Sequence, residues 1–166
     1  MSDLWQQVKF IFQIENKGRV KISPEVIEKT FKYVQDSDEK LEGGGVLLGR
    51  FLVNSKNIIV DKVTEPMAGD IRKRNFFKRG EETHQKIINE EWEISNGRCN
   101  YLGEWHTHAE KYPTPSNIDL IEWKKKLHND VFSSRYLYFI ILGINELRVW
   151  EGDRRTLKIK RINNYV

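Results

Sequence analysis

The chain has 166 residues, of which 39% are hydrophobic, 31% charged and 11% aromatic, with a net charge of +4. This composition excludes an intrinsically disordered chain and fits one folded domain, which we expect to span residues 1–166. The single cysteine, Cys99, excludes an internal disulfide and any zinc site that needs two cysteines.

No segment has the length or composition of a membrane span. The longest apolar run, residues 136–142, is far shorter than the ~20 residues that a spanning helix needs. Residues 1–7 carry neither the basic nor the apolar region of a secretory signal. We therefore expect a cytoplasmic protein with no membrane partner. The modest positive charge permits an acidic partner or nucleic acid and specifies neither.

Apolar periodicity predicts the elements of the first half. Strands are expected over residues 8–14 and 19–22, followed by a helix that is capped by Ser23 and runs to about residue 35. Paired strands are expected over 45–53 and 57–63. Residues 65–80 contain one proline and two glycines, which predicts a long functional loop.

The same patterns predict two helices and four strands in the second half of the sequence. A helix over 81–94, a strand over 101–106 and a rigid loop over 112–115 lead to a helix from Ser116 to about residue 128. That helix is expected to bury Ile118, Ile121 and Leu127. A strand buried on both faces is expected over 136–142. Polar strands over 146–150 and 156–162 flank a predicted turn at 151–153. The order of these elements predicts an α/β fold, a mixed sheet with helices on its faces.

Two histidines and an aspartate have the spacing of a metal site. His106 and His108 are two residues apart on a predicted strand, so their imidazoles leave the same face. Asp119 lies in the first turn of the next predicted helix. Two histidines and one carboxylate would leave a fourth tetrahedral position for water, as in catalytic zinc sites. Each part also has a plain structural interpretation: ordinary sheet histidines, and a helix capping box formed by Ser116 and Asp119.

Taken together, these residues resemble a known motif. The pattern His-x-His-x7-Ser-x-x-Asp, from His106 to Asp119, matches the motif of the JAMM (MPN+) metallopeptidases position for position. That family also has a glutamate before a glycine-rich strand, and Glu42-Gly-Gly-Gly-Val-Leu-Leu-Gly is similar to it. Ala109 departs from the family pattern, which usually has proline there. The resemblance covers about residues 35–142.

Within this family, the chain is most similar to the small bacterial JAB-type peptidases encoded beside E1-like (ThiF-type) enzymes, as in CBASS antiphage operons. The residues that add to this likeness are His84, Gln85, residues 101–105, Trp92 and Trp123. The resemblance implies a single-domain JAB/MPN fold, which is cytidine-deaminase-like and has a mixed β-sheet flanked by helices.

The resemblance also implies a site and an activity. One Zn²⁺ per chain would be held by His106, His108 and Asp119, with Glu42 as the general base and then acid, and Ser116 as the donor to the oxyanion. The implied enzyme is an isopeptidase that hydrolyses the amide bond between a protein's C-terminal tail and an amine or lysine. Its substrate would be a conjugated CD-NTase-like or ubiquitin-like protein. An E1/E2-like conjugating enzyme would be a further partner, and the tail would bind as an added strand.

Three alternatives stay open at this point. The chain could be a catalytically silent MPN-type scaffold, or it could bind nucleic acid through the basic, phenylalanine-containing segment 72–79. A cysteine isopeptidase would use Cys99 as the nucleophile, although a lone cysteine is typically a small buried hydrophobe. His84 and His128 are predicted on helix surfaces.

Overall fold

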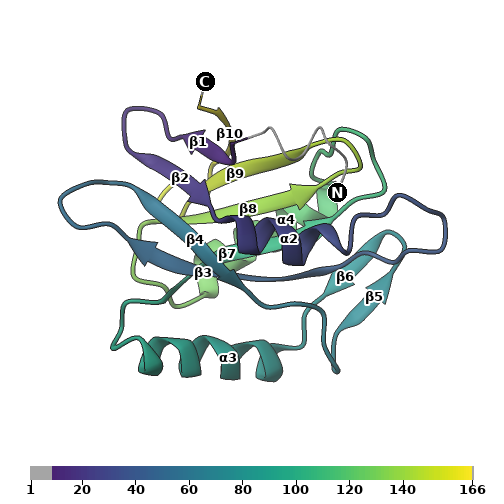
Figure 1. Cartoon of the computed structure of the whole chain (residues 1–166), viewed down its shortest axis with the longest axis horizontal. Coiled ribbons are helices and arrows are strands. Elements are labelled where there is room, and N and C mark those ends of the chain that lie inside the picture. Colours follow the sequence, from purple (N-terminus) through teal and green to yellow (C-terminus); the bar gives the residue numbers. More distant parts are fainter. Residues whose placement is uncertain (1–8, 166) are drawn as a thin grey trace.

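The computed structural model describes residues 9–165, which contain ten strands and three helices (Figure 1). In chain order these are β1 (Ile11–Gln13), β2 (Arg19–Ile22), α2 (Pro24–Phe31), β3 (Gly44–Phe51), β4 (Ile58–Val63), β5 (Ile71–Lys73), β6 (Phe76–Lys78), α3 (Glu81–Ile94), β7 (Asn100–Thr107), α4 (Asn117–Asn129), β8 (Tyr136–Leu142), β9 (Leu147–Asp153) and β10 (Ile159–Asn164). Within the described range, no helix has the length and apolar character needed to cross a membrane.

Eight strands form one mixed sheet that closes on itself. The order around the barrel is β1-β10-β9-β8-β7-β3-β4-β2. The pairs β2/β4 and β7/β8 are parallel, and the other pairs are antiparallel. The predicted α/β fold with a mixed sheet and flanking helices is confirmed. Closure of the sheet, which leaves the barrel strands without free edges, goes beyond that prediction.

The two faces of the sheet bury two separate clusters of apolar side chains. In β8, Tyr138 and Ile140 join one cluster, whereas Phe139 and Ile141 join the other. Alternate residues of a strand point to opposite faces, so burial on both faces explains the continuous apolar run. Helix α2 packs into the first cluster, while α3 and α4 cover the second. In Figure 1, α3 lies along the outside of the sheet.

Several predicted boundaries were wrong for identifiable reasons. The loop predicted over 65–80 contains a two-stranded hairpin, β5–β6, whose strands of three residues are too short to show a period. Helix α2 ends at Phe31, before the predicted end near residue 35, and Gln35 instead turns its amide inward. The first strand covers only Ile11–Gln13, and the predicted start at Val8 lies outside the described residues.

The predicted turn at 151–153 was also wrong. Strand β9 continues to Asp153, and the chain turns after it. Glu151 stays in the strand because Tyr138 donates a 2.9 Å hydrogen bond to its carboxylate and Lys17 approaches it at 3.2 Å. A polar residue with such partners can be buried in a strand, so its polarity did not mark a turn.

Helix α4 buries a different face from the one predicted. Ile118 and Ile121 are 58% and 55% exposed, so their predicted burial was wrong. Trp123 and the correctly predicted Leu127 face the core instead, and Trp123 stacks on Phe139 with ring centroids 4.5 Å apart. The large Trp123 ring fills the space against β8 and thereby sets the rotation of the helix.

Candidate active site

The register of two strands brings the predicted site residues together. Strands β3 and β7 are antiparallel, with Gly44 opposite His106. The same register continued by two residues sets Glu42, just before β3, opposite His108, just after β7. Helix α4 follows this end of β7 through a short loop and supplies Asp119 from its first turn.

The donor atoms of three of these side chains converge. The Nε2 atoms of His106 and His108 are 3.1 Å apart, and they lie 3.3 Å and 3.0 Å from Asp119 Oδ2. The Glu42 carboxylate reaches only one of the three, at 3.5 Å from His108 Nε2. Glu42 also forms a compact donor group with the two histidines, in which all three ligand atoms lie within 4.8 Å of one another. Asp119 is nearer to both imidazoles, which favours Asp119 as the third ligand and leaves Glu42 free.

This donor set fits a zinc ion. Imidazole nitrogens and carboxylate oxygens are the usual zinc ligands besides cysteine. Ligands 2.0–2.1 Å from a tetrahedral ion lie roughly 3.3 Å from one another, which agrees with the spacing of 3.0–3.3 Å between the atoms of His106, His108 and Asp119. A set of three protein ligands leaves one tetrahedral position open.

Ser116 caps helix α4 and keeps its hydroxyl hydrogen available as a donor. Its Oγ caps helix α4 by accepting a 3.0 Å hydrogen bond from Asp119 N, and its own backbone N–H donates to Asp119 Oδ2 at 2.8 Å. The predicted capping box is therefore present beside the donor cluster. Since the hydroxyl accepts in the cap, its hydrogen remains available for another acceptor.

Burial and charge shift the pKa values in the site. Burial raises the pKa of Glu42 to about 7, although the nearby His106 and His108 lower it. Burial also raises the pKa of Asp119, but the hydrogen bonds from the two imidazoles outweigh it and hold that pKa well below the ordinary value. Burial lowers the pKa of His108, but its contacts with Asp119 and Glu42 raise that pKa by a larger amount, so the net shift is upward. The cluster therefore favours a positive charge at its centre, and Glu42 is suited to exchange protons near neutral pH.

The hairpin β5–β6 holds the backbone of Glu42. Glu42 N donates to Lys73 O at 2.8 Å, and Arg72 Nε donates to Glu42 O at 2.8 Å. Phe77 packs on the adjacent strand so closely that a Cβ atom at Gly44 would lie 2.4 Å from its ring. The backbone that carries this carboxylate is thus fixed by a segment about thirty residues later in the chain.

A buried polar chain links this hairpin to the histidine strand. Thr107 Oγ1 donates to Gln35 Oε1 at 2.9 Å and accepts from Gly43 N at 2.9 Å. Gln35 Nε2 in turn donates to Arg74 O at 2.6 Å. Gln35, Thr107 and Arg72 were not predicted from the sequence as supporting residues. The one available signal was the position of Thr107 between the two histidines, on the opposite face of the strand.

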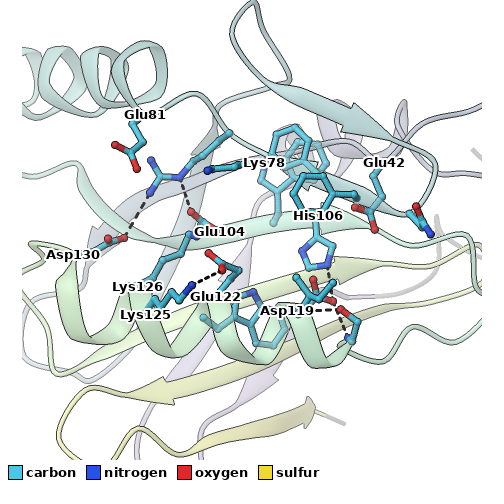
Figure 2. Close-up of a pocket in the computed structure, with 18 of the residues that line it drawn as sticks. Glu42, Lys78, Glu81, Glu104, His106, Asp119, Glu122, Lys125, Lys126 and Asp130 are labelled. Atoms are coloured by element: carbon cyan, nitrogen blue, oxygen red, sulfur yellow. Dashed lines mark hydrogen bonds and ion pairs between the residues drawn. The ribbon is translucent and has the colours of Figure 1, made fainter.

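A cavity of about 420 Å³ extends from the donor cluster between the hairpin and α4. Figure 2 shows Glu42, His106 and Asp119 at one end and Glu81 and Asp130 at the other. The cavity is lined by both apolar and charged side chains, including Phe76, Lys78, Glu104, Ile118, Glu122 and Trp123.

The arginines of the basic segment 72–79 bond to other groups of the protein. Arg72 bonds to the Glu42 carbonyl, Arg74 donates to carbonyl oxygens of residues 37 and 40, and Arg79 pairs with Glu104 at 2.5 Å. Lys73 and Lys78 are the exposed lysines of the segment. Most of its charge is therefore used to fix the hairpin, which disfavours the nucleic-acid alternative.

His84 is fully buried, so its predicted surface position was wrong. Thr64 Oγ1 lies 2.7 Å from its Nδ1, and Asp70 Oδ1 lies 2.9 Å from its Nε2. Both ring nitrogens are satisfied, which allows complete burial. His128 is exposed on α4, as predicted.

Cys99 is buried in the cluster under α3 and α4. Burial, together with the nearby carboxylates of Asp61 and Glu91, raises the pKa of its thiol. A reactive cysteine needs the opposite environment, one that favours the thiolate. The cysteine-isopeptidase alternative is therefore disfavoured.

The fold is that of a JAB-type domain. The family model described as "Prokaryotic homologs of the JAB domain" matches residues 25–153, and the chain belongs to this family. The fold is also similar to a solution structure of a Desulfitobacterium hafniense protein, with a TM-score of 0.62 and 14% identity over 89% of this chain and 91% of that one.

Curated relatives are similar over most of their length. One from Pseudomonas aeruginosa is 35% identical over 81% of this chain and 84% of its own. One from Vibrio cholerae is 31% identical over 96% of both chains, and one from Escherichia coli is 30% identical over 94% of both. Each of the three is named a CD-NTase/cGAS isopeptidase.

Proposed function

We propose that this protein is a zinc-dependent isopeptidase of the JAMM type that acts in CBASS antiphage defence. It hydrolyses the amide bond between the C-terminal tail of a conjugated protein and a lysine or other amine. The observation that carries this proposal is the convergence of donor atoms from His106, His108 and Asp119, with Glu42 beside them. The names of the relatives support a conjugated CD-NTase as the substrate. An E1/E2-like conjugating enzyme is the expected partner in the same cytoplasmic system.

The residues divide the chemistry among them. His106, His108 and Asp119 bind one Zn²⁺, which when bound supplies Lewis acidity and lowers the pKa of water towards ~7. Glu42 accepts a proton as water adds to the scissile carbonyl carbon, and it passes that proton to the amine as the C–N bond breaks. The Ser116 hydroxyl donates a hydrogen bond to the developing oxyanion. The products are a free C-terminal carboxylate and the released amine.

The hairpin offers a strand edge for the tail. Strand β5 lies between β6 and the Glu42 segment, whereas β6 pairs with β5 alone among the described strands. Phe76 and Lys78 of β6 line the cavity that ends at the donor cluster. An extended tail can therefore pair with the free edge of β6 through main-chain hydrogen bonds and present its last carbonyl to the site.

Zinc content and cleavage together test this proposal. Purified wild type should contain one zinc per chain by elemental analysis, and Asp119→Ala should contain none. Wild type should release a CD-NTase joined through its C-terminal carboxyl group to a lysine-containing peptide, and a chelator should stop the reaction until zinc is restored. Glu93→Ala, on the exposed face of α3, is the matched control and should behave as wild type.

Two results would contradict the proposal. Wild type that stays free of zinc after purification without chelators and addition of zinc would favour the silent-scaffold alternative. Cleavage that persists in Glu42→Gln at the wild-type rate would show that another group acts as the base. We expect that variant to retain zinc and to lose turnover.

A further inference from the structure

Glu110 lies in the loop between β7 and α4, directly behind one of the proposed ligands. Its Oε2 atom is 3.3 Å from His108 Nδ1, the ring nitrogen that points away from the donor cluster. The other nitrogen of the same ring, Nε2, faces Asp119 Oδ2 at 3.0 Å. Each ring nitrogen of His108 therefore faces a carboxylate: Glu110 lies on Nδ1, whereas Asp119 and, at 3.5 Å, Glu42 lie on Nε2.

The position of Glu110 is set by contacts that do not involve the imidazole. Thr114 N donates to its Oε2 at 3.1 Å, and Ile144 N donates to its carbonyl oxygen at 2.7 Å. His108 itself is tied to the same region, because its backbone N–H donates to Leu142 O at 3.0 Å. The backbones of His108 and Glu110 are thus both anchored to the end of β8 and the turn after it, and Thr114 holds the Glu110 carboxylate.

The chemistry of this contact decides which nitrogen of His108 carries hydrogen. Both ring nitrogens face carboxylates, which only accept hydrogen bonds. A zinc ion would take the lone pair of Nε2, so the one remaining ring hydrogen would be the Nδ1–H, which donates to Glu110. A histidine ligand whose other nitrogen donates to a carboxylate is fixed in orientation and is a more basic ligand. We propose that Glu110 is a positioning residue that selects the His108 tautomer able to bind zinc and strengthens the binding of that ion. This inference rests on the proposed zinc site and adds a residue outside its ligands.

Zinc affinity, measured by competition with a fluorescent chelator, tests the inference without any substrate. Glu110→Ala should bind zinc roughly 10–100-fold more weakly than wild type, and Glu110→Gln should show a smaller loss because its amide oxygen can still accept one hydrogen bond. Glu93→Gln, which removes an exposed carboxylate from α3, should bind as wild type. The melting temperature of each metal-free protein, compared in the same buffer, reports any loss of loop structure.

The possible outcomes separate the two hypotheses. Equal zinc affinity in wild type and Glu110→Ala would overturn this inference alone, whereas wild type that binds no zinc would refute the proposed function as well. Weaker binding with an unchanged metal-free melting temperature supports the positioning role.

If Glu110→Ala lowers both the zinc affinity and the metal-free melting temperature, nitrogen-15 NMR of the histidines in the zinc-loaded proteins distinguishes a positioning role from a loss of loop structure. A slowly exchanging Nδ1–H on His108 that becomes fast-exchanging in Glu110→Ala supports the inference. Zinc bound through Nδ1 of His108 overturns it.

Discussion

Glu42→Gln should make the metal-free protein more stable at alkaline pH, at the expense of activity. Glu42 is only 5% exposed, and its burial raises the pKa from 4.5 to about 7. The folded protein therefore holds this proton more tightly than the unfolded chain does. The stabilisation is complete below the unfolded-state pKa and is lost as the pH rises through the folded-state pKa.

The two pKa values set the size of the effect. One pKa unit corresponds to about 1.4 kcal/mol, so a rise from 4.5 to about 7 amounts to a maximum of about 3.4 kcal/mol. Between about pH 5 and about pH 8, the expected loss of unfolding free energy from this group is about 2.5 kcal/mol. Glutamine has a similar shape and does not ionise, so the variant should lack this part of the pH dependence.

Urea unfolding of the chelator-treated protein at several pH values measures the difference. The quantity of interest is the free energy of unfolding of wild type minus that of Glu42→Gln, followed across the pH range. Glu28→Gln, on the exposed face of α2, controls for the removal of a carboxylate. A difference that stays constant with pH would refute the reasoning, because it would mean that burial does not disfavour the charged form of Glu42.

Three further predictions follow from packing and hydrogen bonding. Gly103→Ala should lower the free energy of unfolding by at least about 3 kcal/mol in a urea titration, because φ is +143° there and the new Cβ would lie 1.7 Å from Tyr138 O. Cys99→Ala should retain isopeptidase activity within about twofold in the conjugate-cleavage assay. A complete loss of activity would instead support Cys99 as the nucleophile. Arg72→Ala should lower kcat by roughly 10-fold or more with little change in KM, because it releases the Glu42 carbonyl. An unchanged kcat would show that the hairpin does not position the base.

Local signals determined much of what could be predicted. Helix α3 and strand β8 have the predicted bounds, since a long helical period and a run of seven apolar residues are strong local patterns. Weaker patterns failed. On α4, the high hydrophobicity of Ile118 and Ile121 predicted that these two side chains are buried. Trp123 packs against the sheet instead, and this orientation of the helix exposes both isoleucines to solvent.

The sequence alone determined the identity and spacing of the candidate ligands, because His106, His108 and Asp119 lie within one short segment whose strand and capped helix are locally encoded. Only the tertiary structure decided how Glu42 reaches them. That depends on the register of β3 against β7 and on a hairpin that bonds both sides of the Glu42 backbone. The carboxylate on Nδ1 of His108, from Glu110, likewise depends on a loop anchored to the turn after β8. Strand pairing and loop anchoring join residues far apart in the chain, and no local pattern records such contacts.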